Sequence, residues 1–249
     1  MWRRTVATAV SRAPSVAHPA QRGAASYWVR ALSNTPGVPP ESPFTFKDIV
    51  SRRRETRLKK SLLYTRTGDK GSSSLFSGER RSKADPTFHA IGVTDELNSV
   101  TGVARQYCLM AGNGLELLLE DIQSRLLDVG AAIATPRNQS NDIKLAKTVF
   151  PAACTMELEC AIDELDSKLP KLKTFILPSG GLAATHLHIA RVVCRRAERT
   201  VVPLLEAGHV DPEVGRYINR LSDFYFAAAR YAALAEGTEE RMWIHRTDS

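Results

Sequence analysis

The sequence contains no run of about 18 or more apolar residues, and so it predicts no segment that crosses a membrane. It also lacks the Gly-x-x-x-x-Gly-Lys-Ser/Thr frame, which excludes a Walker A phosphate loop. Its few cysteines show neither the Cys-x-x-Cys spacing nor the histidine spacing of a zinc site. No metal site is therefore predicted from side-chain clusters. Free, mostly buried thiols are expected at Cys108, Cys154, Cys160 and Cys194.

Acidic residues are absent from the first forty positions, where arginine, alanine and serine are frequent. No stretch there is apolar enough for the core of a secretory signal. An acid-free leader of this kind is typical of a mitochondrial transit peptide, so we expect residues 1–40 to direct the chain to the mitochondrial matrix. A disordered tail is the alternative. The arginines are Arg3, Arg4, Arg12, Arg22 and Arg30.

The formal charge of +7 falls by five, to +2, once those leader arginines are set aside. A second basic cluster lies within residues 47–60, so residues 41–61 are expected to form a basic linker. The rest of the chain is near neutral, which argues against a broad nucleic-acid-binding face.

Apolar residues recur at three- and four-residue spacing over five long stretches after residue 87, which predicts an all-α fold. Short connections between them favour a five-helix up-and-down bundle over residues 62–240. Residues 62–65 and 175–177 are expected to be short extended pieces. The polar stretch 137–148 has no role that its composition reveals. The predicted helices span residues 88–111, 115–134, 149–168, 181–206 and 211–236.

The block Tyr64–Lys83 concentrates glycine, hydroxyl side chains and five lysines or arginines in twenty residues. Gly68 and Gly71 permit a tight turn and a close backbone approach to a ligand. Consecutive N–H groups in such a turn form a concave nest for anionic oxygens, and the neighbouring bases supply positive charge. The block predicts a polyphosphate site. A solvated Gly-Asp surface turn is the alternative.

The predicted fourth helix carries Arg191, Arg195 and Glu198 on one face. Guanidinium groups suit phosphate because their donors form a planar fork. A solvated basic helix face is the alternative, although valines on both sides leave little room for a wholly wet surface. His186 and His188 are two positions apart, so they face different directions and are interpreted as surface or packing residues.

Four motifs in this order resemble one family: GERRSKADPTFHAIGVTDELNSVTG, FILPSGG, CRRAER and NRLSDFYFAAARYA. That family is the trimeric, helical-bundle ATP-dependent cobalamin adenosyltransferases, in particular their mitochondrial animal forms. The resemblance covers roughly residues 62–236. It implies transfer of the 5′-deoxyadenosyl group of ATP to cob(I)alamin, giving adenosylcobalamin and triphosphate. It also implies a homotrimer and methylmalonyl-CoA mutase as the acceptor of the product.

The resemblance implies an ATP site that combines the N-terminal loop of one subunit with the fourth helix of its neighbour. Mg²⁺ accompanies the nucleotide, and Glu198 orients an arginine or holds Mg²⁺ through water. Asn219 has the alternative of a mid-helix residue facing Asp223. The implied ATP-binding positions are Thr65, Arg66, Thr67, Gly68, Asp69, Lys70, Gly71, Ser73, Lys83, Arg195, Arg196, Glu198, Arg199 and Asn219.

The resemblance also gives Phe175 and Arg195 catalytic roles. Phe175 would lie against the lower face of the corrin, exclude the dimethylbenzimidazole ligand and leave cobalt four-coordinate. The residues alone favour one more core aromatic at this position. Asp95 would pair with Arg191 across the subunit boundary, whereas the residues alone favour a helix-surface acid. An ATP-binding helical kinase or ATPase that does not use cobalamin is the alternative function, and it would need an acidic base near the γ-phosphate.

Overall fold

The computed structural model describes residues 46–56, 61 and 63–245, so the predicted transit peptide lies outside the described residues. The chain divides into two units between Tyr64 and Thr65. The first unit contains α2 (Phe46–Thr56), inside the segment expected to be a basic linker. Phe46, Ile49 and Val50 of this helix are exposed. None of the described side chains of this helix is buried, so they form no buried apolar stripe of the kind from which the other helices were predicted.

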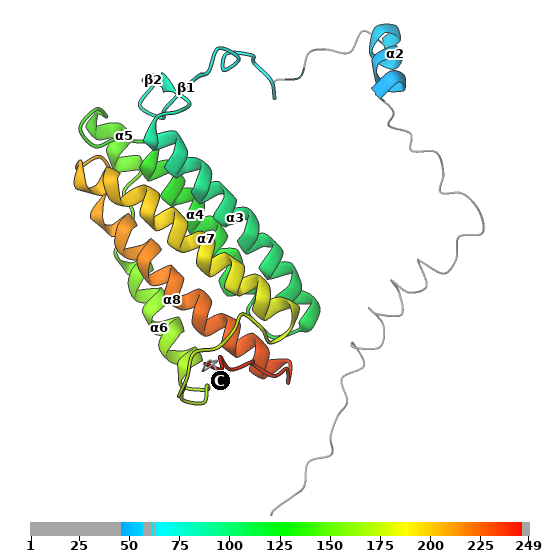
Figure 1. Cartoon of the computed structure of the whole chain (residues 1–249). Helices are drawn as coiled ribbons and strands as arrows, with labels where there is room; N and C mark the ends of the chain where they lie inside the picture. The colour runs from blue at the N-terminus through cyan, green and yellow to red at the C-terminus, as the bar shows by residue number, and fades with distance from the viewer. Residues whose placement is uncertain (1–45, 57–60, 62, 246–249) are drawn as a thin grey trace, which may run out of the picture. The chain divides into compact units, whose positions relative to one another are not determined.

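The second unit is a bundle of five long helices with one short helix in a connection (Figure 1). This confirms the predicted all-α five-helix bundle. The short helix α5 was not predicted, because a single turn and a half buries no side chain and leaves no apolar period. The helices are α3 (Pro86–Ala111), α4 (Glu116–Ile133), α5 (Asp142–Lys147), α6 (Ala153–Asp166), α7 (Gly181–Glu206) and α8 (Pro212–Ala235).

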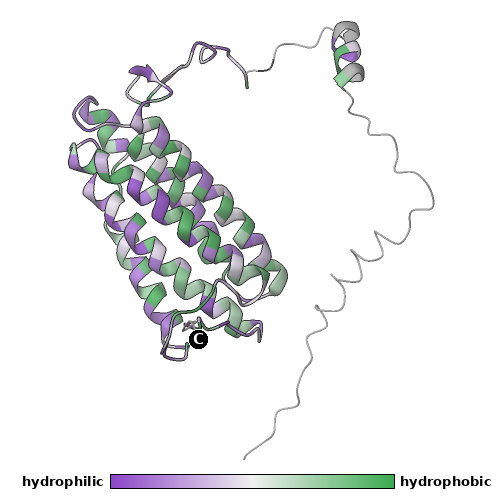
Figure 2. Ribbon diagram, viewed as in Figure 1, coloured by the Kyte–Doolittle hydropathy of each residue, from purple (hydrophilic) through white to green (hydrophobic). Residues whose placement is uncertain are grey.

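Helix α7 is central: it packs against α3 on one side and α8 on the other, while α4 packs on α3 and α6 on α8. Hydrophobic and hydrophilic residues alternate along all five long helices (Figure 2), and the apolar ones form one continuous core. Tyr217 and Tyr225 are among the largest fully buried side chains. The hydroxyl of Tyr225 lies 2.6 Å from Oγ1 of Thr101, which satisfies both buried hydroxyl groups.

Local sequence signals set the turn between α7 and α8. Asp211 caps α8 by accepting a hydrogen bond from the N–H of Glu213 at 3.0 Å, and Pro212 begins the helix. Gly208, with φ of 69°, follows the end of α7 in the left-handed conformation that glycine favours. Along the described part of the chain, no helix combines the length and apolar character that a bilayer span requires.

Extended structure is confined to small pieces. The two strands β1 (Ser72–Ser74) and β2 (Arg80–Ser82) form an antiparallel hairpin that the sequence did not predict. Residues 63–65 are not a strand, and Leu62 lies outside the described residues, so the extended segment before the bundle occurs later than expected. Of the second predicted piece, 175–177, Ile176 forms an antiparallel bridge with Met242.

The cysteines and histidines behave as expected. All four cysteines are free; Cys160 is exposed and the other three are buried. Burial raises the pKa of Cys108 to about 11, so that thiol stays protonated and unreactive. His188 is buried, and burial lowers its pKa to about 4, so it is a neutral packing residue. His186 stacks on Tyr107 with 4.3 Å between ring centroids.

Candidate active site

The predicted phosphate loop leads into the hairpin. A Cβ atom at Gly68 would lie 3.2 Å from Nζ of Lys83, so glycine is what lets this ammonium group approach the backbone. Gly71 has φ of 77°, and its carbonyl accepts the N–H of Lys83 at 2.9 Å. The hydroxyl oxygens of Thr65 and Thr67 are 2.9 Å apart. The structure therefore brings the two ends of the loop together around a cationic group.

Two arginines of β2 stabilise the loop and the hairpin through hydrogen bonds within the protein. Arg80 donates to the carbonyl of Thr67 at 2.9 Å and to Oγ of Ser72 at 2.7 Å. Arg81 donates to Oε2 of Glu79 at 2.9 Å and to Oγ1 of Thr87 at 3.1 Å, which ties the hairpin to the start of α3. Both arginines lie in the block whose bases were expected to attract phosphate. Their donors are used inside the protein instead.

The stretch 137–148, whose role the sequence left open, supports the same hairpin. Lys144 on α5 donates from Nζ to the carbonyl of Ser77 at 2.7 Å, and Gln139 accepts a hydrogen bond from Arg81. Arg137 forms an ion pair with Asp211, the cap of α8, at 2.6 Å. This stretch therefore connects the phosphate loop to the α7–α8 turn.

The arginines of α7 divide into two groups. Arg195 and Arg199 are exposed one turn apart and make no ion pair among the described residues, so their guanidinium groups remain available. Arg196 pairs instead with Glu96 on α3. Glu198 accepts a hydrogen bond from Nδ2 of Asn219 at 2.7 Å.

That contact corrects the alternative interpretation of Asn219, which placed it opposite Asp223 on its own helix. Asp223 accepts a hydrogen bond from Arg220 at 3.0 Å. The amide of Asn219 instead reaches across to α7. It thereby fixes the carboxylate of Glu198 beside the arginines.

A cavity of about 1430 Å³ opens between the α6–α7 connection, α7 and α8. Pockets for small ligands typically measure about 300–1,000 Å³, so this one suits a large organic molecule. Arginines line one part of it and aromatic rings another. The arginines are Arg191, Arg195 and Arg230, and the aromatic residues are Phe175, Phe226 and Trp243.

Phe175 is 80% exposed and lines this cavity, so the expectation of a core aromatic is wrong. Its ring meets that of Trp243 edge-on, with 6.3 Å between centroids. Sequence pattern failed here because FILP reads as an apolar segment whichever way its side chains point. An apolar ring that is held exposed at a cavity wall indicates a ligand-binding role.

Arg191 is electrostatically unsatisfied within one chain. Its Nε is buried and has no hydrogen-bond partner, and its guanidinium lies 5.9 Å from the ring of Phe226. Burial, and then the charge of Arg195, lower the pKa of Arg191. Asp95 is exposed on α3, and its carboxylate forms no ion pair among the described residues. One chain therefore does not bring this predicted pair together.

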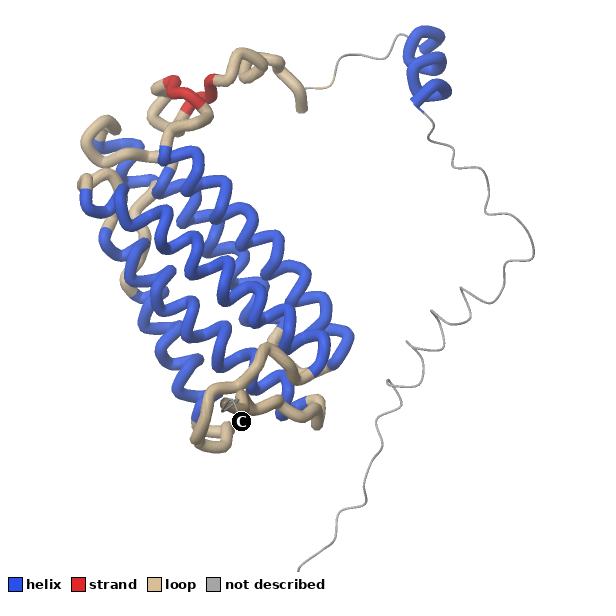
Figure 3. The backbone as a smooth tube through the Cα atoms, in the orientation of Figure 1, coloured by secondary structure: helices blue, strands red, loops and turns tan. Residues whose placement is uncertain are grey.

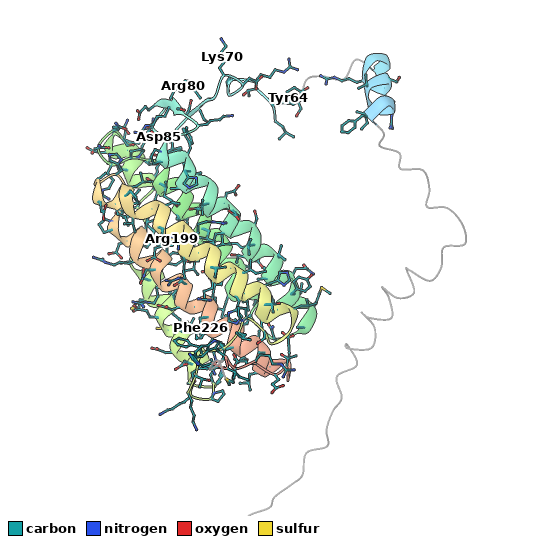
Figure 4. All side chains as sticks on the ribbon, viewed as in Figure 1. Tyr64, Lys70, Arg80, Asp85, Arg199 and Phe226 are labelled. Carbon is teal, nitrogen blue, oxygen red and sulfur yellow. The ribbon has the colours of Figure 1, made fainter. Side chains whose placement is uncertain are left out.

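The phosphate loop and the arginines of α7 are also apart in one chain. Figure 4 places Lys70 beyond the end of the bundle at which α3 begins, whereas Arg199 lies part-way along α7. Phe226 lies further along, towards the opposite end. The predicted ATP-binding residues thus fall into two separate groups. Thr65, Arg66, Thr67, Gly68, Asp69, Lys70, Gly71, Ser73 and Lys83 form the first, and Arg195, Arg196, Glu198, Arg199 and Asn219 the second.

A helical bundle with a glycine-containing basic loop, an arginine face and a large aromatic cavity defines a nucleotide-dependent transferase with a bulky second substrate. Residues 63–232 match the cobalamin adenosyltransferase family, and the chain belongs to that family.

Curated relatives agree with this assignment. The chain is 50% identical over 181 residues to the corrinoid adenosyltransferase MMAB of Mus musculus, which covers 73% of this chain and 76% of that protein. Its identity to the Homo sapiens protein is 48% over 187 residues, or 75% of each chain.

Solved structures agree as well. A variant PduO-type ATP:corrinoid adenosyltransferase from Lactobacillus reuteri, complexed with cobalamin and ATP, superimposes with a TM-score of 0.68. It is 37% identical to this chain and is matched over 74% of this chain and 99% of its own length. A second variant of that protein, complexed with ATP, superimposes with a TM-score of 0.66 at 38% identity.

The sequence did not single out Phe226, Arg230 or Trp243. Phe226 and Arg230 are hidden in the regular stripe of α8, where aromatic and alanine residues read as core. Trp243 follows the last helix in a segment without periodicity. These residues meet at the cavity because the segment after α8 folds back against the α6–α7 connection. No local sequence pattern predicts that long-range contact.

Proposed function

We propose that this chain transfers the 5′-deoxyadenosyl group of ATP to cob(I)alamin, with the corrin in the cavity beside Phe175. The observation that carries this proposal is Arg195, which belongs to the arginine face of α7 and also lines the cavity. A phosphate chain and a corrin held on either side of this residue would place their reacting atoms next to one another.

The proposed reaction exchanges one bond for another. The electron pair of Co(I) attacks C5′ of ATP, the Co–C bond forms, and the C5′–O bond breaks as triphosphate leaves. Cob(I)alamin is itself a strong nucleophile, so no general base is required. The protein has to align the two substrates and neutralise charge on the leaving oxygens. Arg195, Arg199 and Lys70 would supply that charge.

Mg²⁺ would enter with the nucleotide. The described residues contain no group of three or more His, Cys, Asp or Glu side chains that could hold a metal ion. Glu198 is a lone carboxylate at the arginine face, already oriented by Asn219. Mg²⁺ commonly keeps several waters and uses one or two carboxylates plus substrate phosphates, which fits this donor set.

The separation of the two groups of ATP-binding residues supports a site shared between subunits of a homotrimer. In such an assembly Asp95 of one subunit would neutralise Arg191 of the next. The buried, unpartnered Nε of Arg191 supports this assignment. Apolar side chains exposed on α7, including Ile189, Val192 and Val202, would be covered by the same contact.

Replacing Asp95 by alanine is expected to weaken association and activity together, with both losses growing on dilution. The reason is that Arg191 would then be buried without an anion. Light scattering and turnover measured across a dilution series check this. The matched control is Asp163→Ala, which removes an exposed carboxylate from α6. A fully active monomer, or an equal effect in the control, would refute the shared site.

Lys144→Met is expected to raise KM for ATP by about three- to tenfold, because the hydrogen bond that holds Ser77 is lost. The maximal rate should remain, since Lys144 is placed behind the phosphate loop and not at the reacting atoms. Steady-state kinetics at varied ATP measure both values. Lys147→Met removes the same charge from an exposed position of α5 and serves as the control. An unchanged KM would show that this support is dispensable.

The leader and the family resemblance support import into the mitochondrial matrix, where methylmalonyl-CoA mutase would receive the product. We expect the mature chain to begin between about residues 25 and 55. Mass spectrometry of the protein from its native source checks this. Retention of Met1 would contradict the import proposal.

The proposed function is tested by titrating the purified chain with ATP and cob(II)alamin while the visible spectrum is recorded. A base-off spectrum that develops only with ATP present is the expected result. Addition of a reductant should then yield adenosylcobalamin and triphosphate in equal amounts. ATP hydrolysis without a spectral change would instead support the kinase or ATPase alternative.

A further inference from the structure

A buried ion pair that includes Arg230, a residue lining the cavity, joins three segments of the chain. Arg230 of α8 is 4% exposed, and its Nε lies 3.3 Å and 3.4 Å from the two carboxylate oxygens of Glu240. Its Nη2 donates to the carbonyl of Pro170 at 2.8 Å. Among the ion pairs of the described residues this is the most buried. Burying two charges costs free energy unless both are well partnered, so the arrangement calls for an explanation.

Glu240 belongs to the segment that follows α8, which pairs with the loop segment that carries Phe175. The N–H of Trp243 donates to the carbonyl of Phe175 at 2.8 Å, and the N–H of Leu177 donates to the carbonyl of Arg241 at 2.8 Å. Figure 3 shows this segment beside the α6–α7 connection at one end of the bundle. Two short extended segments paired in this way, called the ribbon below, have little stability alone.

Further contacts attach the ribbon to the bundle below Phe175. Thr238 donates from Oγ1 to the carbonyl of Gly180 at 2.7 Å. Gly180 itself lies so close to α8 that a Cβ atom there would be 2.6 Å from Cβ of Ala233. This fixes the end of the ribbon next to α7. Between this contact and the pairing of Arg241 with Leu177, Glu240 attaches the ribbon to α8 through Arg230.

We infer that Arg230 and Glu240 are positioning residues, which hold the backbone of Phe175 so that its ring stays in the cavity. This inference rests on the proposed role of Phe175 beneath the corrin. Arg230 contacts both partners of the ribbon, Pro170 on the approach to Phe175 and Glu240 on the segment that pairs with it. Loss of either charge would remove the side-chain link that joins α8 to the ribbon and to the segment leading to Phe175.

The expected defect is confined to the cobalamin half of the reaction. The phosphate loop lies at the other end of the bundle. Arg195 and Arg199 belong to α7, whereas the ion pair links the ribbon to α8. ATP binding should therefore persist. The fraction of cob(II)alamin that becomes four-coordinate should fall, because the ring of Phe175 would no longer occupy one place.

Glu240→Gln and Arg230→Met are made in the full-length chain. Each is expected to lower kcat about tenfold and to reduce the four-coordinate electron paramagnetic resonance signal, with KM for ATP unchanged. The control is Arg241→Ala, which removes a 71% exposed side chain from the same ribbon. Because a lone buried charge can unfold a protein, the Arg230→Met/Glu240→Gln double variant is also tested; it leaves no unpaired charge.

A double-mutant cycle separates positioning from a general structural effect. In the Phe175→Ala background, Glu240→Gln should lower kcat no further, because the residue that it positions is gone. Additive losses, or a change in KM for ATP as large as that in kcat, would overturn the inference. Wild-type kinetics in the double variant would overturn it too. Failure of the proposed role of Phe175 is seen separately, as a four-coordinate signal that survives Phe175→Ala alone.

Discussion

Phe175→Ala is expected to lower turnover by about two orders of magnitude while leaving thermal stability and ATP binding nearly unchanged. A buried phenylalanine cut back to alanine would leave a cavity and cost about 3–5 kcal/mol of stability. Phe175 is 80% exposed, so the folded chain has little packing to lose there. The expected loss is chemical. Cob(II)alamin that keeps an axial ligand resists reduction, whereas the four-coordinate form accepts an electron more readily.

Electron paramagnetic resonance of cob(II)alamin with enzyme and ATP distinguishes these states directly. The wild-type protein should show the four-coordinate signal and the Phe175→Ala variant should lack it. Leu177→Ala is a suitable control, since Leu177 is 47% exposed two residues further along the same segment and does not line the cavity. A full four-coordinate signal in the Phe175 variant would assign the role to another residue, with Trp243 and Phe226 as the next candidates.

The long helices were predictable because each buries one face, and a buried face requires apolar residues at three- and four-residue spacing in the sequence. Helix α8 shows this best: Val214, Tyr217, Ile218, Leu221 and Tyr225 recur at helical spacing and are all buried. Its start was predictable from Asp211 and Pro212, because a cap and a first-turn proline act locally. Local signals of this kind do not depend on the rest of the fold.

The smaller elements were not predictable, because they are held by contacts between distant segments. The hairpin of β1 and β2 consists largely of serine and arginine, and it is held by Arg81, Lys144 and the turn around them. The bridge between Ile176 and Met242 joins residues that no local pattern connects. Helix α5 buries no side chain, so its sequence carries no apolar period.

The candidate site shows the same division. The glycines of the phosphate loop and the arginines of α7 could be predicted as phosphate-binding residues from their types and spacing. Their separation in one chain was not, because spacing within a helix says nothing about which subunit completes a site. The environment of Phe175 was ambiguous in the same way. An apolar residue in a loop is compatible with the core and with a ligand, and only its exposure decides.

Arg195→Ala is expected to reduce kcat/KM for ATP by about ten- to over a hundredfold, the equivalent of one charge-assisted contact of roughly 1.5–3 kcal/mol. Arg195 is exposed on α7, lines the cavity and makes no ion pair among the described residues, so the fold does not depend on it. Arg195→Lys keeps the charge but loses the planar fork, so its kcat/KM should lie between those of the wild-type protein and of Arg195→Ala. The loss should appear in kcat as well as in KM, because charge on the triphosphate oxygens grows as the C5′–O bond breaks.

Steady-state kinetics with ATP varied at saturating cob(I)alamin provide the measurement, and size-exclusion chromatography checks the assembly. Arg216→Ala is the control, since that arginine is exposed on α8 and pairs with Glu213 away from the cavity. Wild-type ATP kinetics in Arg195→Ala would remove this residue from the phosphate site. Aggregation or loss of assembly would make it an interface residue instead. A rise in KM with kcat intact would mean that Arg195 binds ATP but does not stabilise the departing triphosphate.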